Sequence, residues 1–453
     1  MKTSRLLFNP LSLLLIIAGW LALALPGCDS GSDNPIDNNP IDTSGTDAGL
    51  TAADFSPAES CMTCHPDQYD QWSGSRHAYS VQDPLWMAIN VAGQSAYVNA
   101  LDQACMPCHA RIGSMSGETP WGGFDVADMS PVSAEGIGCD LCHSISSIHG
   151  LENGRYDLNP GEVKYGTIDN PVSTTAHKQE YNSLYPSGEY CGSCHDFVLS
   201  NGFPLEAVFR EWRDGGLAMT GKTCNDCHMT TYVGKAATQG PDRIVHRHDF
   251  IGADVVLTEF PNKPEQLAAV TEMLQNALTV QFGIPDSVTA GSAMEISATV
   301  TNDKTGHAVP SGVPFNRQMW LAVVVTDALG DTVYSSGMFD ANDDLMDESS
   351  DFPERDPDLV NYQAQMLRAD STKTGATWEA AGLDNPAIYP NQTRHETYSV
   401  AVPQGTAGPL SVEMKLRFRS FGPSTFRAFG QEDLLPIPIV DMASGLSTVT
   451  VLP

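Results

Sequence analysis

Residues 61–65 read Cys-Met-Thr-Cys-His, and this short stretch decides how the first half of the chain is built. Four later stretches repeat the Cys-x-x-Cys-His pattern with other residues between the cysteines. We number the motifs 1 to 5 in chain order: Cys61, Cys64 and His65; Cys105, Cys108 and His109; Cys139, Cys142 and His143; Cys191, Cys194 and His195; Cys224, Cys227 and His228. Of the 11 cysteines, only Cys28 lies outside a motif.

The spacing of the motif residues suits covalent attachment of c-type haem. Two thiols three residues apart can form thioethers with the two vinyl groups of one porphyrin, and the adjacent imidazole then lies under the iron as proximal ligand. A zinc half-site or a thioredoxin-like thiol pair also contains Cys-x-x-Cys. Neither alternative requires a histidine after each pair or five repeats in one chain. The sequence therefore predicts five covalently attached c-type haems.

The motif histidines lie 44, 34, 52 and 33 residues apart, so residues 57–255 provide about 40 residues for each haem. With so little chain per cofactor, the haems must supply much of the buried apolar volume. We expect a mostly helical and irregular domain of short helices and loops packed around haem. Without haem, this domain should not fold.

Seven further histidines are available as sixth iron ligands, enough for bis-histidine ligation of all five irons. The expected distal ligands are His77, His177, His248, His149 and His307. Of the neighbours His246 and His248, the second is favoured. His149 fits a surface position equally well, and His307, in a turn-rich loop, could instead stabilise that loop. His395 falls in a strand-like stretch and is expected on a sheet surface.

Stretches around three motifs resemble a known family. Residues 60–78, SCMTCHPDQYDQWSGSRHA, residues 136–143, GIGCDLCH, and residues 190–196, YCGSCHD, are similar to multihaem cytochromes c related to the nitrification-associated tetrahaem cytochrome. The resemblance covers about residues 57–255 and implies that His77 is a distal ligand. The wider group includes pentahaem nitrite reductases, whose catalytic haem has a lysine in place of the motif histidine. All five motifs here end in histidine, so that catalytic assignment does not transfer.

The N-terminus has the layout of an export signal. Lys2 and Arg5 precede an apolar run, and Leu25-Pro-Gly-Cys28 resembles a bacterial lipobox. We expect a lipoprotein signal peptide at 1–27, lipidation of Cys28 and a flexible acidic tether at 28–56. An uncleaved anchor or an ordinary signal peptide are the alternatives. The expected location is the cell envelope, periplasmic or on the outer surface.

The last third of the chain has no Cys-x-x-Cys-His motif and shows the sequence patterns of a helix followed by strands. Residues 264–277 have apolar residues at helical spacing, which predicts a connecting helix within 256–278. Beyond it, alternating β-branched stretches broken by Gly, Asp and Pro predict an all-β immunoglobulin-like sandwich over 279–453. The acidic cluster around Asp343–Asp351 lacks EF-hand spacing and favours a solvated loop over a calcium site. The predicted fold class is therefore multidomain α+β.

The amino-acid composition excludes two classes of protein, nucleic-acid-binding proteins and multi-pass membrane proteins. The formal net charge of -31 excludes the basic footprint that nucleic-acid binding needs, and 41% hydrophobic residues are too few for several membrane spans. The leading hypothesis is electron transfer along five haems to redox partner proteins that carry basic patches. The alternative is a multihaem oxidoreductase acting on a small nitrogen or sulfur compound at one haem with an open site. A third hypothesis is a surface lipoprotein that assembles into a conductive filament.

Overall fold

The structure is a computed structural model that describes residues 49–96, 104–172 and 174–453. The expected signal peptide, Cys28 and most of the expected tether lie outside the described residues. The end of that tether is folded, because Leu50, Ala52 and Phe55 pack against an apolar cluster that includes Ile112. Ala52 begins the 3-10 helix η1 (Ala52–Asp54), and Phe55 follows it directly. The folded part of the chain therefore begins before residue 57.

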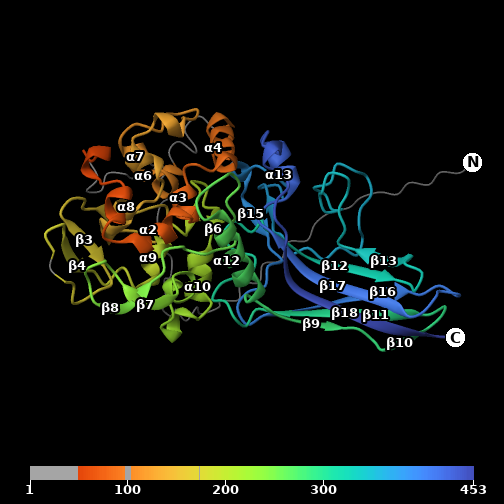
Figure 1. Ribbon diagram of the computed structural model, residues 1–453. Coiled ribbons are helices and arrows are strands. Elements are labelled where there is room, and N and C mark those ends of the chain that lie inside the picture. The colour runs from red at the N-terminus through yellow and green to blue at the C-terminus, as the bar shows by residue number, and fades with distance from the viewer. Residues whose placement is uncertain (1–48, 97–103, 173) are drawn as a thin grey trace, which may run out of the picture. The chain divides into compact units, whose positions relative to one another are not determined.

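Residues 57–255, which we call the motif region, consist of short elements joined by loops (Figure 1). Its helices are α1 (Glu59–Met62), α2 (Pro66–Ser73), α3 (Arg76–Tyr79), α4 (Pro84–Ala96), α5 (Met106–His109), α6 (Arg111–Met115), η2 (Val126–Asp128), α7 (Pro131–Ala134), α8 (Cys139–His143), α9 (Gly188–Gly192), α10 (Val208–Asp214), η3 (Ala218–Thr220) and α11 (Cys224–His228). Apart from α4, none of these helices exceeds eight residues. The apolar clusters of this region are correspondingly small.

Four pairs of short strands complete the motif region. They are β1 (Ile145–Ile148) with β2 (Tyr156–Leu158), β3 (Val163–Gly166) with β4 (Lys178–Tyr181), β5 (Phe197–Val198) with β6 (Pro204–Glu206), and β7 (Thr231–Lys235) with β8 (Asp242–His246). The pair β3 and β4 is parallel, and the other three pairs are antiparallel. Each pair fixes a loop beside a motif without building an extended sheet.

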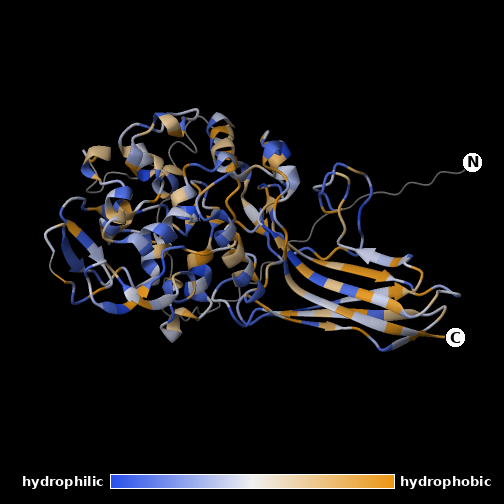
Figure 2. Ribbon diagram, in the orientation of Figure 1, coloured by the Kyte–Doolittle hydropathy of each residue, from blue (hydrophilic) through white to orange (hydrophobic). Residues whose placement is uncertain are grey.

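Residues 279–453, the β region, contain two sheets. Their order is β10-β18-β17-β12-β13 in one sheet and β16-β11-β9 in the other. The strands are β9 (Thr279–Gly283), β10 (Ser287–Thr289), β11 (Ala293–Thr301), β12 (Gln318–Thr326), β13 (Thr332–Ser336), β16 (Thr393–Ala401), β17 (Leu410–Arg419) and β18 (Val440–Leu452). Polar and apolar residues alternate along much of these strands (Figure 2), and both sheets contribute to one apolar core.

The β region also has smaller elements and a partly buried acidic loop. The smaller elements are the pair β14 (Gln365–Leu367) and β15 (Gly382–Asp384) with η4 (Thr377–Glu379), α13 (Pro423–Ala428) and η5 (Glu432–Leu434). The acidic stretch predicted to be a solvated loop is partly buried. Asp344 is fully buried and forms an ion pair with Arg427, so its charge is compensated inside the protein.

The two regions pack together. Helix α12 (Lys263–Gln275) lies between them in the chain, and its residues Val270 and Leu274 join the core of the β region. Phe203 of the motif region packs with Phe315 of the β region, and Arg317 forms an ion pair with Asp254 at 2.8 Å. These contacts hold the loop that follows β11 against the motif region. The predicted mixed α+β class is confirmed, and no helix among the described residues combines the length and apolar character needed to cross a membrane.

Candidate functional site

Each motif lies on or beside a single helical turn. In motifs 1, 2 and 4, the backbone N–H of the histidine donates to the carbonyl of the first cysteine at 2.9 to 3.2 Å. Motifs 3 and 5 lie in the helices α8 and α11. Residues three apart share one face of a helix, so both thiols point to the same side with the imidazole beside them. This is the local geometry that a doubly attached porphyrin requires.

The ring nitrogen Nδ1 of four motif histidines faces a backbone carbonyl oxygen. The pairs are His65 with Ala236 at 2.5 Å, His109 with Ser80 at 3.3 Å, His143 with Tyr165 at 2.6 Å and His228 with Ile251 at 2.6 Å. A carbonyl oxygen can only accept, so Nδ1 carries the hydrogen and the lone pair is on Nε2. That tautomer is the one that offers Nε2 to a metal ion.

Four motif histidines have a second histidine ring opposite. The ring centroids are 6.2 Å apart for His65 and His177, 6.4 Å for His143 and His248, 6.1 Å for His195 and His77, and 6.2 Å for His228 and His307. A metal ion bound at about 2 Å by each of two imidazoles separates their centroids by roughly 6 Å. The four pairs are therefore spaced to hold one metal ion each.

The second ring of three pairs is half-buried and neutral. Burial, together with neighbouring histidines, lowers the pKa of His77 to about 3 and the pKa of His248 and of His307 to about 4. Nδ1 of His77 is buried without a hydrogen-bond partner among the described residues. Neutral imidazole is the form that binds metal, so these residues fit an iron site.

His109 of motif 2 has no such partner. All 12 histidines of the chain lie in described residues, and the ring against His109 is that of Trp86, stacked at 4.5 Å with an angle of 7° between the planes. Of the histidines outside the four pairs, His149 lies 3.5 Å from Asp157, His246 faces the Met229 carbonyl at 2.7 Å and His395 contacts Thr299. His149, which the sequence predicts as a distal ligand, faces no motif histidine, and its ring contacts Asp157 near the surface instead.

His307 reaches the motif region from the loop after β11. The fully buried Asn302 donates to the carbonyls of His307 and Ile388, both at 2.8 Å, which fixes the backbone of this loop. Glu211 of α10 accepts from the Ala308 N–H at 3.1 Å and from the Ser311 hydroxyl at 2.6 Å. The interface between the two regions therefore positions His307 opposite His228.

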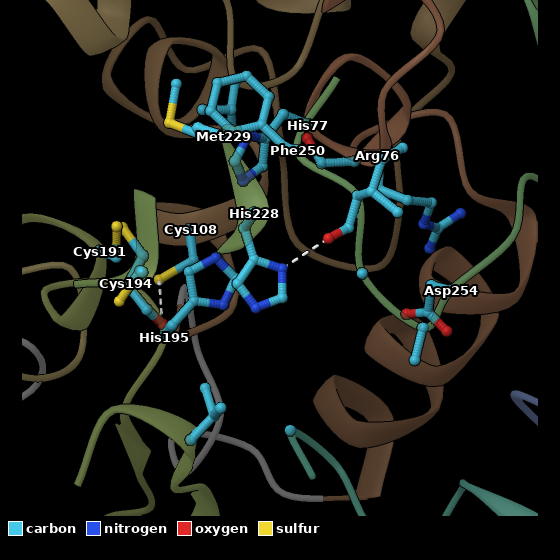
Figure 3. Close-up of a pocket in the computed structure, with 18 of the residues that line it drawn as sticks. Arg76, His77, Cys108, Cys191, Cys194, His195, His228, Met229, Phe250 and Asp254 are labelled. Carbon is cyan, nitrogen blue, oxygen red and sulfur yellow. Dashed lines mark hydrogen bonds between the residues drawn. The ribbon is translucent and has the colours of Figure 1, made fainter. Parts of the chain in front are cut away.

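All five motifs and the four distal rings line one continuous cavity of about 2840 Å³. A pocket for one small ligand has about 300–1000 Å³, so this volume suits several large groups. The motifs also lie against one another. The Cys108 thiol donates to the Cys194 carbonyl at 3.8 Å, and the thiol of Cys61 lies beside that of Cys139, as does that of Cys191 beside that of Cys224. Figure 3 shows His77, Cys108 and His228 around the motif 4 residues Cys191, Cys194 and His195.

Three residues at the site carry no signal in the sequence. Trp86 covers His109, Asn302 supports His307, and Glu206 lies 3.1 Å from Nδ1 of His195. Each of these residues contacts a histidine that is not its neighbour in the chain, and no known motif spacing links the two. The sequence did identify the distal histidines as candidates, because the histidines outside the motifs outnumber the five motifs. It did not predict which distal histidine faces which motif.

Comparison with known proteins supports the chemistry of the motifs. Residues 60–144 match the family described as cytochrome c554 and c-prime. A penta-heme cytochrome c552 from Thermochromatium tepidum has a similar fold, with 19% identity over 87% of this chain and 99% of that chain and a TM-score of 0.62. A CARDB domain from Pyrococcus furiosus aligns with 12% identity over 39% of this chain and 87% of that chain, at a TM-score of 0.18. No curated protein matches.

Proposed function

We propose that this chain is a multihaem cytochrome c that holds five covalent c-type haems and transfers electrons between them, a proposal supported by the family match of residues 60–144 and by the similar fold of a penta-heme cytochrome c552. The ten motif cysteines would form the thioether bonds, and His65, His109, His143, His195 and His228 would be the proximal ligands. Bound haem iron supplies the one-electron exchange between Fe(III) and Fe(II).

The observation that carries the proposal is the set of four facing histidine pairs at 6.1 to 6.4 Å. We assign His177, His77, His248 and His307 as distal ligands to motifs 1, 4, 3 and 5 respectively. Two neutral imidazoles on each iron favour a low-spin, low-potential centre that changes little in geometry on reduction, which suits electron transfer.

The contacts between motifs indicate the order in which electrons would pass from haem to haem. Cys61 touches Cys139, which brings motifs 1 and 3 together, and the Tyr190 hydroxyl donates to the Cys142 carbonyl at 3.0 Å, which links motif 3 to motif 4. Motif 4 in turn touches motif 2 through Cys108 and motif 5 through Cys224. Motif 4 is therefore the junction of the path.

The electron-transfer proposal is tested by reducing the purified protein rapidly with a substoichiometric amount of photoreduced flavin. We expect electrons to redistribute among the haems at a rate independent of protein concentration, because the motifs are in contact. A haem that exchanges electrons only through collisions between molecules would contradict the proposed path.

One observation favours a second function at motif 2. The ring against His109 is that of Trp86, so no histidine would fill the sixth position of an iron held by motif 2, unlike irons held by the other four motifs. A small nitrogen or sulfur compound could bind there, with the remaining haems supplying or removing electrons. Candidate substrates are nitrite, hydroxylamine and sulfite.

The second function is tested by titrating the ferric protein with cyanide and the ferrous protein with nitric oxide. We expect one ligand to bind per chain, with the electron paramagnetic resonance signals of four bis-histidine haems unchanged. Binding only after one of those four signals is lost would show that motif 2 has no open position.

We also propose that the chain is exported and lipid-anchored through Cys28, in the periplasm or at the outer surface of the cell envelope. Covalent haem supports this, because c-type haem is attached outside the cytoplasm. Its partners would be redox proteins with basic patches, which the net charge of -31 attracts. Mass spectrometry of the N-terminal peptide from wild type and from Cys28→Ala tests the anchor.

The role proposed for the β region is structural support of the motif 5 site. We propose an immunoglobulin-like sandwich, which is supported by two sheets over one shared core. Its loop after β11 would contribute the distal ligand His307.

A further inference from the structure

One motif histidine differs from the other four in what accepts its Nδ1 hydrogen. Four rings donate to neutral backbone carbonyl oxygens, whereas His195 of motif 4 donates to the carboxylate oxygen Oε1 of Glu206 at 3.1 Å. None of the distal rings faces a carboxylate. Nδ1 of His177, of His248 and of His307 faces a backbone carbonyl, and Nδ1 of His77 has no hydrogen-bond partner among the described residues. Among the proposed iron ligands, only His195 therefore donates its Nδ1 hydrogen to a carboxylate.

The fold holds Glu206 in this position. Glu206 ends strand β6, and Phe197 of β5 lies opposite it, so the hairpin that follows motif 4 returns the carboxylate to His195. Among the described residues, the His195 ring is the only group that hydrogen-bonds the Glu206 side chain. The nearby Arg317 is occupied by Asp254 and by the Ser420 carbonyl. A glutamate side chain is ordinarily ionised at neutral pH, so the His195 ring faces a charged carboxylate rather than a neutral carbonyl.

An ionised acceptor changes the ligand that the ring presents to iron. A carboxylate attracts the Nδ1 hydrogen more strongly than a carbonyl does, and the ring becomes a more basic donor at Nε2. A more basic ligand stabilises Fe(III) relative to Fe(II), which lowers the reduction potential. One electron enters on reduction, and the proton stays on Nδ1 in both states.

We propose that Glu206 makes the haem of motif 4 the lowest-potential haem of the chain. This inference rests on the proposed electron-transfer function and on the place of motif 4, which touches motifs 2, 3 and 5. An electron that reaches the junction therefore does not stay there but moves on to a neighbouring haem. Glu206 is a positioning and tuning residue, since it acts through His195.

The test compares Glu206→Gln with Glu152→Gln in the full-length holoprotein. The first variant replaces the charged acceptor with a neutral one of the same size. The second removes the same charge from an ion pair with Arg155 and Arg210 and leaves the acceptor of every motif histidine in place. Redox titration followed by absorbance and by electron paramagnetic resonance resolves the individual haems. In Glu206→Gln the lowest of the midpoint potentials should rise while the others stay in place, and in Glu152→Gln none should move.

The proposal is overturned if Glu206→Gln leaves the lowest potential unchanged or shifts a different haem. Should Glu206→Gln fail to load haem, His77→Met supplies an independent test, because an axial methionine raises the potential of its own haem. His77→Met must then raise the lowest component, and a rise in any other component overturns the proposal. Absence of covalent haem or of reversible reduction in the wild type would instead contradict the proposed function itself.

Discussion

Single histidines decide the spin state of single haems in the proposed arrangement. His307→Ala removes the ring opposite His228, so the iron of motif 5 loses its sixth ligand. We expect about a quarter of the low-spin bis-histidine signal to convert to high spin. His149→Ala is the matched control, since His149 contacts Asp157 at the surface and should leave the spectrum unchanged. An unchanged spectrum in His307→Ala would remove His307 from the ligand set.

The half-buried histidines also predict how stability responds to acid. The pKa of His77 is about 3 and that of His248 and His307 about 4, below their ordinary value of 6.5. Below about pH 6.5 these three side chains therefore bind more protons in the unfolded chain than in the folded chain, and through them the free energy of unfolding falls as the pH drops toward 4. Urea unfolding at a series of pH values from 7.5 to 4 should show this loss. A free energy of unfolding that rises over this interval would contradict the neutral, half-buried rings.

At the scale of elements, helices α9 and α10 pack so closely that only glycine fits between them. A Cβ on Gly192, inside motif 4, would lie 2.5 Å from the Phe209 ring. Gly192→Ala should therefore lower the free energy of unfolding by about 1–3 kcal/mol through overpacking, with less haem bound at motif 4. Chemical unfolding and haem content measure the two effects. Gly166→Ala is the control, because open space surrounds a Cβ at that position, and equal effects in both variants would refute the packing argument.

The loop after β11 is the second element on which a haem site depends. Asn302→Ala removes one of the two donors to each of the carbonyls of His307 and Ile388, which keep only the Thr305 hydroxyl and the Val309 N–H respectively. We expect a loss of about 1–3 kcal/mol in the free energy of unfolding and a broadened signal from the haem of motif 5. Thermal unfolding and electron paramagnetic resonance provide the readouts. The exposed Asn276, whose side chain bonds only to Glu272 of its own helix, is the control, and an Asn302→Ala protein indistinguishable from Asn276→Ala would rule out this support.

The whole molecule carries a net charge of -31, and this charge governs its encounters with other redox molecules. Reduction by a cationic reagent such as hexaammineruthenium(II) should slow with added salt, by roughly tenfold or more between low and high ionic strength. Reaction with an anionic reagent such as ferricyanide should accelerate instead. Stopped-flow measurement over a salt series checks both. If added salt changed both reaction rates in the same direction, the net charge of the protein would not control how these reagents reach the haems.

The sequence by itself predicted a multihaem cytochrome c and the mixed α+β class. The match of residues 60–144 to the cytochrome c554 and c-prime family and the similar fold of a penta-heme cytochrome c552 support the first, and the structure confirms the second. Both could be predicted because they depend on local patterns in the sequence. A Cys-x-x-Cys-His motif spans a single helical turn, and the alternation of polar and apolar residues in a strand repeats every two residues. The expected signal peptide and lipidated Cys28 stay predictions, as do the number of haems and the immunoglobulin-like type of the sandwich.

Only the tertiary structure decided which histidines face each other. His177 lies opposite His65 although motifs 2 and 3 intervene, His77 lies opposite His195, and His307 comes from the β region. The same holds for Trp86 beside His109 and for Glu206 beside His195. These contacts join elements that are far apart in the chain or outside any motif spacing. A periodic or local pattern carries no information about such contacts, because they are set by how the short helices and the two regions pack together.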